Sequence, residues 1–201
     1  MRILMTFLAV FILSLPLYAA TEDKAPSVAR AEDYLRDLTT ARARFLQTAH
    51  DGSQLIGTFY LSRPGKLRFE YDDPVEDFIV ADGFFIYFYD AALGEQTNAP
   101  IGQTLADFLL RSDLRLDGDI TVQKIHRDGG LLQITLTQTT DPAAGSLTLG
   151  FTEEPLALKK WRVTDAMGLI TEIELFQLET AIELPGNLFA YHNPGPRRYN
   201  D

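Results

Sequence analysis

The segment Ser62–Pro100 constrains the fold more than any other part of the chain. It reads as short extended runs separated by turn signals such as Pro64-Gly65 and Asp82-Gly83. Aromatic and aliphatic residues fall on both faces of these runs, whereas a half-buried sheet alternates apolar with polar residues. A sheet with two apolar faces must cover both of them. One arrangement that does so is a helix on one side and a bound apolar ligand on the other.

The first twenty residues have the pattern of a secretory signal peptide. Arg2 precedes the apolar run Ile3–Leu13, and Ser14–Ala20 ends in small residues. The run is too short to favour a spanning helix. We therefore predict a signal peptide over residues 1–20, cleaved after Ala19 or Ala20, and a periplasmic location. No cysteine follows the run, so lipid attachment at that point is excluded.

Length and charge limit the class of protein further. Residues 21–201 suit a single domain with a sizeable core. The net charge of −10 makes nucleic acid a poor partner. The chain has 0 cysteines, so its core must be stable without disulfides. We expect a monomer.

Periodicity predicts many strands and few helices. Helical spacing predicts an amphipathic helix over Val28–Asp37 with Ser27 as its cap, and a second helix capped by Thr104. Alternation and turn signals predict eleven strands: Ala41–Thr48, Gln54–Ser62, Lys66–Tyr71, Glu76–Ala81, Phe84–Tyr89, Gly94–Thr97, Ile120–Arg127, Leu131–Thr137, Ser146–Phe151, Ala157–Val163 and Ile170–Leu178. So many hairpin-linked strands curl toward a barrel. The predicted fold class is α+β, a curved antiparallel sheet with a helical cover.

Signatures of catalysis are missing from the sequence. There is no G-x-S-x-G, G-x-G-x-x-G, P-loop or H-E-x-x-H motif. His50, His126 and His192 share no ligand spacing. We predict no enzyme activity, no cofactor and no metal.

Arg63 is the charged residue that the pattern singles out. It follows Leu55, Phe59 and Leu61 on the apolar face of one predicted strand, directly before Pro64. Its five donors require acceptors. In one interpretation it bends to solvent or pairs with a nearby carboxylate of Glu70 or Asp72. In the other it reaches backbone carbonyls of the helical cover and holds that cover closed.

Several segments resemble the LolA family of periplasmic lipoprotein carriers. The likeness is densest in Phe45-Leu46-Gln47, in Ser62–Tyr71 (SRPGKLRFEY), in Ile79–Gly83 and in Tyr89-Asp90, and it extends over about residues 28–194. The resemblance implies an incomplete barrel of eleven antiparallel strands with a helical lid over a hydrophobic cavity. It also implies acylated lipoproteins as cargo, an inner-membrane LolCDE-type ABC transporter as donor, and an outer-membrane LolB-like acceptor. Phe69 stands where the family often has tryptophan.

The resemblance and the apolar stripes together give a set of candidate site residues. Arg63 would be the lid clasp. The predicted acyl-chain cavity residues are Leu55, Phe59, Leu61, Leu67, Phe69, Tyr71, Phe78, Val80, Ile86, Phe88 and Trp161. The predicted lid residues are Val28, Leu35, Leu105, Phe108 and Leu109.

Other functions remain open on the sequence. The same cup could serve a periplasmic carrier or sensor of another lipid class. An esterase or glycosidase has the least support, because no nucleophile–base arrangement is visible.

Overall fold

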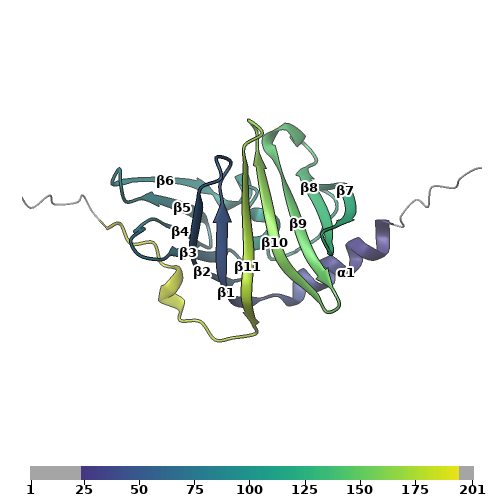
Figure 1. Ribbon diagram of the computed structural model, residues 1–201, viewed down its shortest axis with the longest axis horizontal. Helices are drawn as coiled ribbons and strands as arrows, with labels where there is room; N and C mark the ends of the chain where they lie inside the picture. Colours follow the sequence, from purple (N-terminus) through teal and green to yellow (C-terminus); the bar gives the residue numbers. More distant parts are fainter. Residues whose placement is uncertain (1–23, 195–201) are drawn as a thin grey trace, which may run out of the picture.

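A computed structural model describes residues 24–194 as one large antiparallel sheet with few helices (Figure 1). The predicted signal peptide and the end of the C-terminal tail lie outside the described residues. The sheet has 11 strands in the order β6-β5-β4-β3-β2-β1-β11-β10-β9-β8-β7. Their bounds are β1 Thr40–Thr48, β2 Gln54–Ser62, β3 Lys66–Tyr71, β4 Phe78–Asp82, β5 Phe85–Asp90, β6 Glu95–Pro100, β7 Ile120–Asp128, β8 Leu131–Gln138, β9 Gly145–Glu153, β10 Leu156–Asp165 and β11 Ile170–Thr180.

The topology is two meanders joined by one long-range pairing. Strands β1 to β6 form the first meander and β7 to β11 the second, and β1 pairs with β11 through registers such as Phe45 with Leu175. The sheet curves but does not close, because its two edge strands, β6 and β7, do not pair with each other. The predicted α+β fold with an incomplete eleven-stranded barrel is confirmed.

Helix α1, Lys24–Asp37, lies behind the sheet in Figure 1. It begins earlier than predicted, so Ser27 is a buried residue within the helix and not its cap. Pro26 stands in the first turn, where its missing N–H costs no hydrogen bond. No helix among residues 24–194 is long and apolar enough to cross a bilayer.

The predicted second helix is two shorter pieces. The 3₁₀ turn η1, Ile101–Gln103, precedes the single-turn helix α2, Asp107–Leu110. Thr104 is extended between them, and its hydroxyl donates to the Ile101 carbonyl at 2.8 Å. Thr104 therefore closes η1 and does not cap α2. Two further 3₁₀ turns, η2 (Pro142–Ala144) and η3 (Gly186–Phe189), lie in the second half of the chain.

The two apolar faces of β3 to β5 are covered differently from the arrangement suggested by the sequence. Register places Leu67, Ile79 and Phe88 on the inner, concave face that α1 and α2 cover. The opposite, outer face is covered by the C-terminal segment. There Phe189 is buried, and the ring of Tyr191 stacks on Tyr87 at 4.3 Å. Both helices thus lie on the inner face, and the C-terminal segment covers the outer face of these strands.

Phe45 and Gly57 form a close contact in the core, and a methyl group at Gly57 should disrupt it. Phe45 is 1% exposed and lies opposite Gly57 across β1 and β2. A Cβ atom at Gly57 would lie 2.1 Å from the Glu70 carbonyl oxygen and 2.7 Å from the Phe45 ring. Neither the backbone at Glu70 nor the packed ring of Phe45 can move far enough to make room for this atom without strain. We expect Gly57→Ala to lower the free energy of unfolding by about 3 kcal/mol. Urea unfolding of Gly57→Ala beside Gly102→Ala, an exposed glycine with open space around its Cβ position, checks this, and equal stability of the two would contradict it.

Candidate functional site

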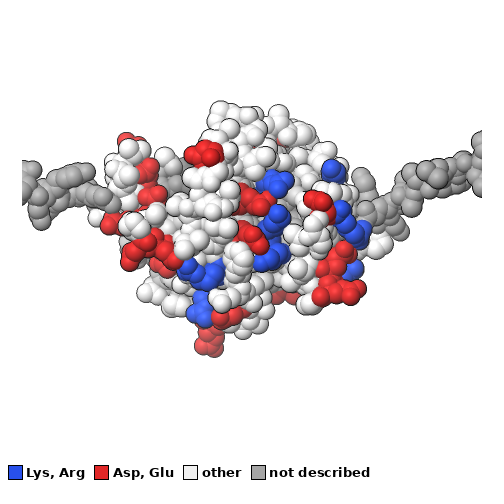
Figure 2. All heavy atoms as spheres, in the orientation of Figure 1, with Lys and Arg blue, Asp and Glu red and all other residues white. Residues whose placement is uncertain are grey.

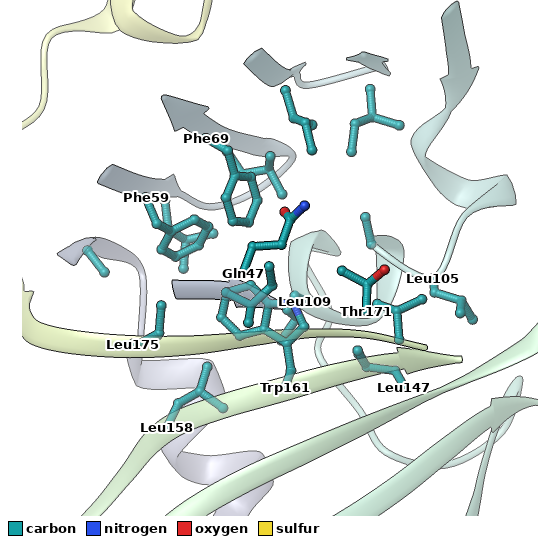
Figure 3. Close-up of a pocket in the computed structure, with 18 of the residues that line it drawn as sticks. Gln47, Phe59, Phe69, Leu105, Leu109, Leu147, Leu158, Trp161, Thr171 and Leu175 are labelled. Atoms are coloured by element: carbon teal, nitrogen blue, oxygen red, sulfur yellow. The ribbon is translucent and has the colours of Figure 1, made fainter. Parts of the chain in front are cut away.

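A hollow of about 360 Å³ lies between the inner face of the sheet and the helical cover (Figure 3). Its walls come from β1 to β5 and β9 to β11, and Leu35, Leu105 and Leu109 of the cover face it. Nearly all the lining side chains are aliphatic or aromatic. The hollow has the apolar lining that is typical of sites for apolar ligands, because so few polar groups face it.

Ten of the predicted residues, besides Arg63, line this hollow. They are Phe59, Leu61, Leu67, Phe69, Ile86, Phe88 and Trp161 from the sheet, with Leu35, Leu105 and Leu109 from the cover. The rings of Phe59, Phe69 and Trp161 contact one another at centroid distances of 4.9 to 6.1 Å. Strands β2, β3 and β10 therefore supply one aromatic wall, although β10 is far from the other two in sequence.

The remaining predicted residues lie elsewhere. Leu55, Tyr71 and Phe78 line a neighbouring hollow at the ends of β2 to β5. Val80 is buried on the outer face, since its neighbours Ile79 and Ala81 face inward. Val28 and Phe108 belong to α1 and α2, but they pack into the core and do not face the hollow.

Sequence reasoning missed about half of the lining residues. These are Leu38, Ala41, Gln47, Ile79, Thr104, Ala106, Leu147, Leu158, Val163, Thr171, Ile173, Leu175 and Leu178. Alternation along the predicted strand Ile170–Leu178 could have placed Ile173 and Leu175 on one face. Alternation could not show that this face shares a hollow with Phe59, because that depends on the pairing of β1 with β11.

Arg63 joins the sheet to the helical cover. Its guanidinium donates to the carbonyl oxygens of Leu38 at 2.9 Å and Arg36 at 3.0 Å, and also to that of Leu35. A longer contact of 3.5 Å reaches the Leu109 carbonyl of α2. The final carbonyls of a helix have no intrahelical partner, so Arg63 satisfies groups that α1 leaves free. Burial lowers the pKa of Arg63 from its usual value, but a guanidinium remains charged at neutral pH.

The carboxylates considered as partners of Arg63 bind other arginines. Asp72 accepts from Arg44 at 2.9 Å, and this bond lowers the pKa of Asp72. Glu70 accepts from Arg68 at 3.1 Å. Register explains the division, because Arg44, Arg68 and Glu70 project from the outer face, whereas Arg63 stands at the turn beneath the cover.

The turn that carries Arg63 is also tied to α2. Gly65 donates its N–H to the Leu110 carbonyl at 2.8 Å. Its φ of 76° suits glycine, and a Cβ atom there would lie 2.8 Å from Gly83 Cα. The β2–β3 turn thus contacts both parts of the cover through Arg63 and Gly65.

The outer face of the sheet differs sharply from the hollow. Figure 2 shows lysines and arginines interspersed with acidic residues over β1, β10 and β11. Pairs include Arg42 with Glu179 at 2.8 Å and Arg162 with Glu172 at 2.7 Å. These charged pairs make the outer face of these strands polar, whereas the inner face is apolar.

Together these features define a class of protein, an open β-barrel that encloses an apolar hollow beneath a helical cover. The family profile described as "Outer membrane lipoprotein carrier protein LolA" matches residues 36–192. The chain belongs to the LolA family.

Two relatives of similar sequence support this assignment over most of the chain. The "Outer-membrane lipoprotein carrier protein" of Methylibium petroleiphilum is 30% identical and covers 88% of this chain and 90% of its own. The protein of the same description from Nitrosospira multiformis is 31% identical over 85% of this chain and 86% of its own. A solved LolA superfamily protein from Nitrosomonas europaea covers 82% of this chain and 96% of its own at 9% identity, with a TM-score of 0.45.

Proposed function

We propose that the protein carries acylated lipoproteins from the inner to the outer membrane, with their acyl chains in the hollow beneath α1 and α2. The observation that carries this proposal is the apolar hollow of about 360 Å³ under a cover held by one arginine. Membership in a family of lipoprotein carriers names the cargo class. An apolar wall with no nucleophile–base pair facing it favours a carrier over an enzyme.

The proposal extends to location and partners. The signal-peptide pattern of residues 1–20 supports a periplasmic location for residues 21–201. A carrier there needs a donor in the inner membrane and an acceptor in the outer membrane. A LolCDE-type ABC transporter and a LolB-like acceptor are the partners that fit a LolA-family protein.

Energetics require that the cargo be only partly enclosed. Three chains of about 16 carbons, at about 0.8 kcal/mol per buried CH₂, would gain roughly 35 kcal/mol if fully buried. The strongest non-covalent complexes have binding free energies of about 20 kcal/mol. A carrier must bind more weakly than this limit because it has to release its cargo. Partial burial, opposed by the Arg63 contacts that close the cover, would make binding reversible.

Native cargo provides the direct test. We expect organic-solvent extraction of protein purified from the periplasm, followed by mass spectrometry, to yield a lipoprotein that still carries its acyl chains. The intact mass of the same preparation should correspond to a chain that begins at Ala20 or Thr21. Incubation with inner membranes should then release a native lipoprotein into a soluble complex with the protein.

The outcomes separate this function from the alternatives. A glycolipid or another lipid in the extract, with no lipoprotein released from membranes, would indicate a carrier or sensor of a different lipid class. Turnover of an ester or glycoside substrate would contradict the carrier assignment.

A further inference from the structure

One polar side chain projects into the apolar hollow without a complete set of partners. Gln47 lies on the inner face of β1, opposite Leu55 of β2 and Ile173 of β11. Figure 3 shows its amide directed toward the middle of the hollow. The other side chains in this wall with polar atoms are Arg63, Thr104, Trp161 and Thr171, and Arg63 and Thr104 donate to backbone carbonyls. Gln47 is the one that brings a primary amide, with two N–H donors, to this wall.

Tyr71 fixes the orientation of this amide. Its hydroxyl donates to Gln47 Oε1 at 2.8 Å, and its ring packs edge-on against Phe45 at 5.4 Å. Burial, with a smaller contribution from Asp77, raises the pKa of Tyr71 to about 12. The hydroxyl stays protonated at neutral pH, and in the structure it donates to Gln47 Oε1. The amide therefore presents its carbonyl to Tyr71 and its NH₂ group to the hollow.

The NH₂ group of Gln47 is a donor with no protein acceptor among residues 24–194. The Tyr71 bond is the side-chain hydrogen bond that Gln47 makes there, and it uses the carbonyl oxygen. Gln47 is only partly buried, so water can reach this donor until a bound chain displaces it. An amide donor that then goes unpaired beside an apolar wall costs free energy. A ligand that brings an acceptor oxygen to this point gains a bond that the protein does not supply.

The position of Gln47 indicates which part of a ligand would bring that oxygen. Gln47, Ile79 and Phe88 line both the main hollow and the neighbouring hollow of about 370 Å³. The neighbouring hollow has polar groups in its wall, among them Asp77 and Asp90. An amphiphile whose acyl chains fill the apolar hollow would place its polar part in the neighbouring hollow. The bonds that link the chains to the polar part would then lie beside Gln47.

We propose that the Gln47 side-chain NH₂ donates a hydrogen bond to an ester carbonyl oxygen at the head of a bound acyl chain, and so sets how deeply the chain enters. This inference rests on the proposed function. Gln47 is a specificity residue here, and Tyr71 is a positioning residue that acts through it. The site discriminates an acyl ester from an alkyl chain of the same length.

A ligand pair that differs only in the carbonyl tests the proposal. One probe is a synthetic lipopeptide whose cysteine carries two ester-linked chains, and the other is its dialkyl ether counterpart with the same chains. The wild-type protein should prefer the ester by about fivefold, the value of one modest hydrogen bond. Gln47→Met keeps the side-chain length and removes the donor, so the preference should fall to about one while ether binding is retained. Tyr71→Phe should give an intermediate preference.

Matched controls separate this role from a structural one. Gln54→Met alters an exposed glutamine on the adjacent strand, outside the hollow, and should leave the ester preference unchanged. Equal losses of ester and ether binding in Gln47→Met would overturn the inference, because a structural role affects both ligands alike. Equal ester and ether affinities in the wild type would also overturn it. Failure of the wild type to bind either lipopeptide would instead contradict the proposed carrier function.

Discussion

Replacing Arg63 with leucine should leave the fold intact and reduce onward transfer of lipoprotein by at least about tenfold. The substitution removes hydrogen bonds to the α1 carbonyls of Leu35 and Arg36 and to that of Leu38 just beyond the helix. Hydrogen bonds from a charged donor contribute about 1.5 to 3 kcal/mol each. After the cost of desolvating the guanidinium is subtracted, their loss should destabilise the closed position of the cover by about 3 kcal/mol. A protein that closes less readily should hold its cargo longer. Transfer from the loaded protein to outer-membrane vesicles, measured over time, checks this.

The control for this experiment is an arginine that lies five residues further along the chain and projects from the outer face. Arg68 lies on β3 of the same β2–β3 hairpin, pairs with Glu70 on the outer face and does not line the hollow. Arg68→Leu should transfer lipoprotein like the wild type. If Arg63→Leu accepted and delivered cargo at wild-type rates, Arg63 would not be the clasp of the cover.

Filling the hollow should weaken acyl binding without unfolding the protein. Leu175 is 3% exposed, lies on the inner face of β11 and points into the hollow (Figure 3). In Leu175→Trp the indole would occupy space that a chain would otherwise fill. Overpacking a core costs about 1 to 3 kcal/mol, and the cost should lie at the lower end because the added bulk enters a void. We expect affinity for a fluorescent acyl chain to fall by about tenfold or more.

The adjacent residue provides a matched control. Phe176 follows Leu175 on the same strand, faces outward and is 39% exposed. Phe176→Trp adds an indole to the same strand but not to the hollow, so its acyl binding should equal that of the wild type. Undiminished binding by a folded Leu175→Trp protein would show that the chain does not occupy this hollow.

The strands were predictable because their signals are local. The predicted bounds Gln54–Ser62 and Lys66–Tyr71 are those of β2 and β3. Here alternation runs directly into a turn, and both signals depend on residues adjacent in sequence. The cover was predicted less well. Thr104 closes η1 and does not begin a helix, and Ser27 lies inside α1, since each helix end depends on contacts with the sheet.

By itself, the sequence determined the number of strands, their hairpin order and the resemblance to one family. The tertiary structure alone decided which apolar face turns inward. Phe69 and Phe88 line the hollow, whereas Val80 lies under the outer cover, although all three stand in equally apolar strands. Likewise, only the pairing of β1 with β11 brings Gln47 beside Ile173. Alternation specifies that two faces differ, but only packing between distant segments can assign one of them to a ligand.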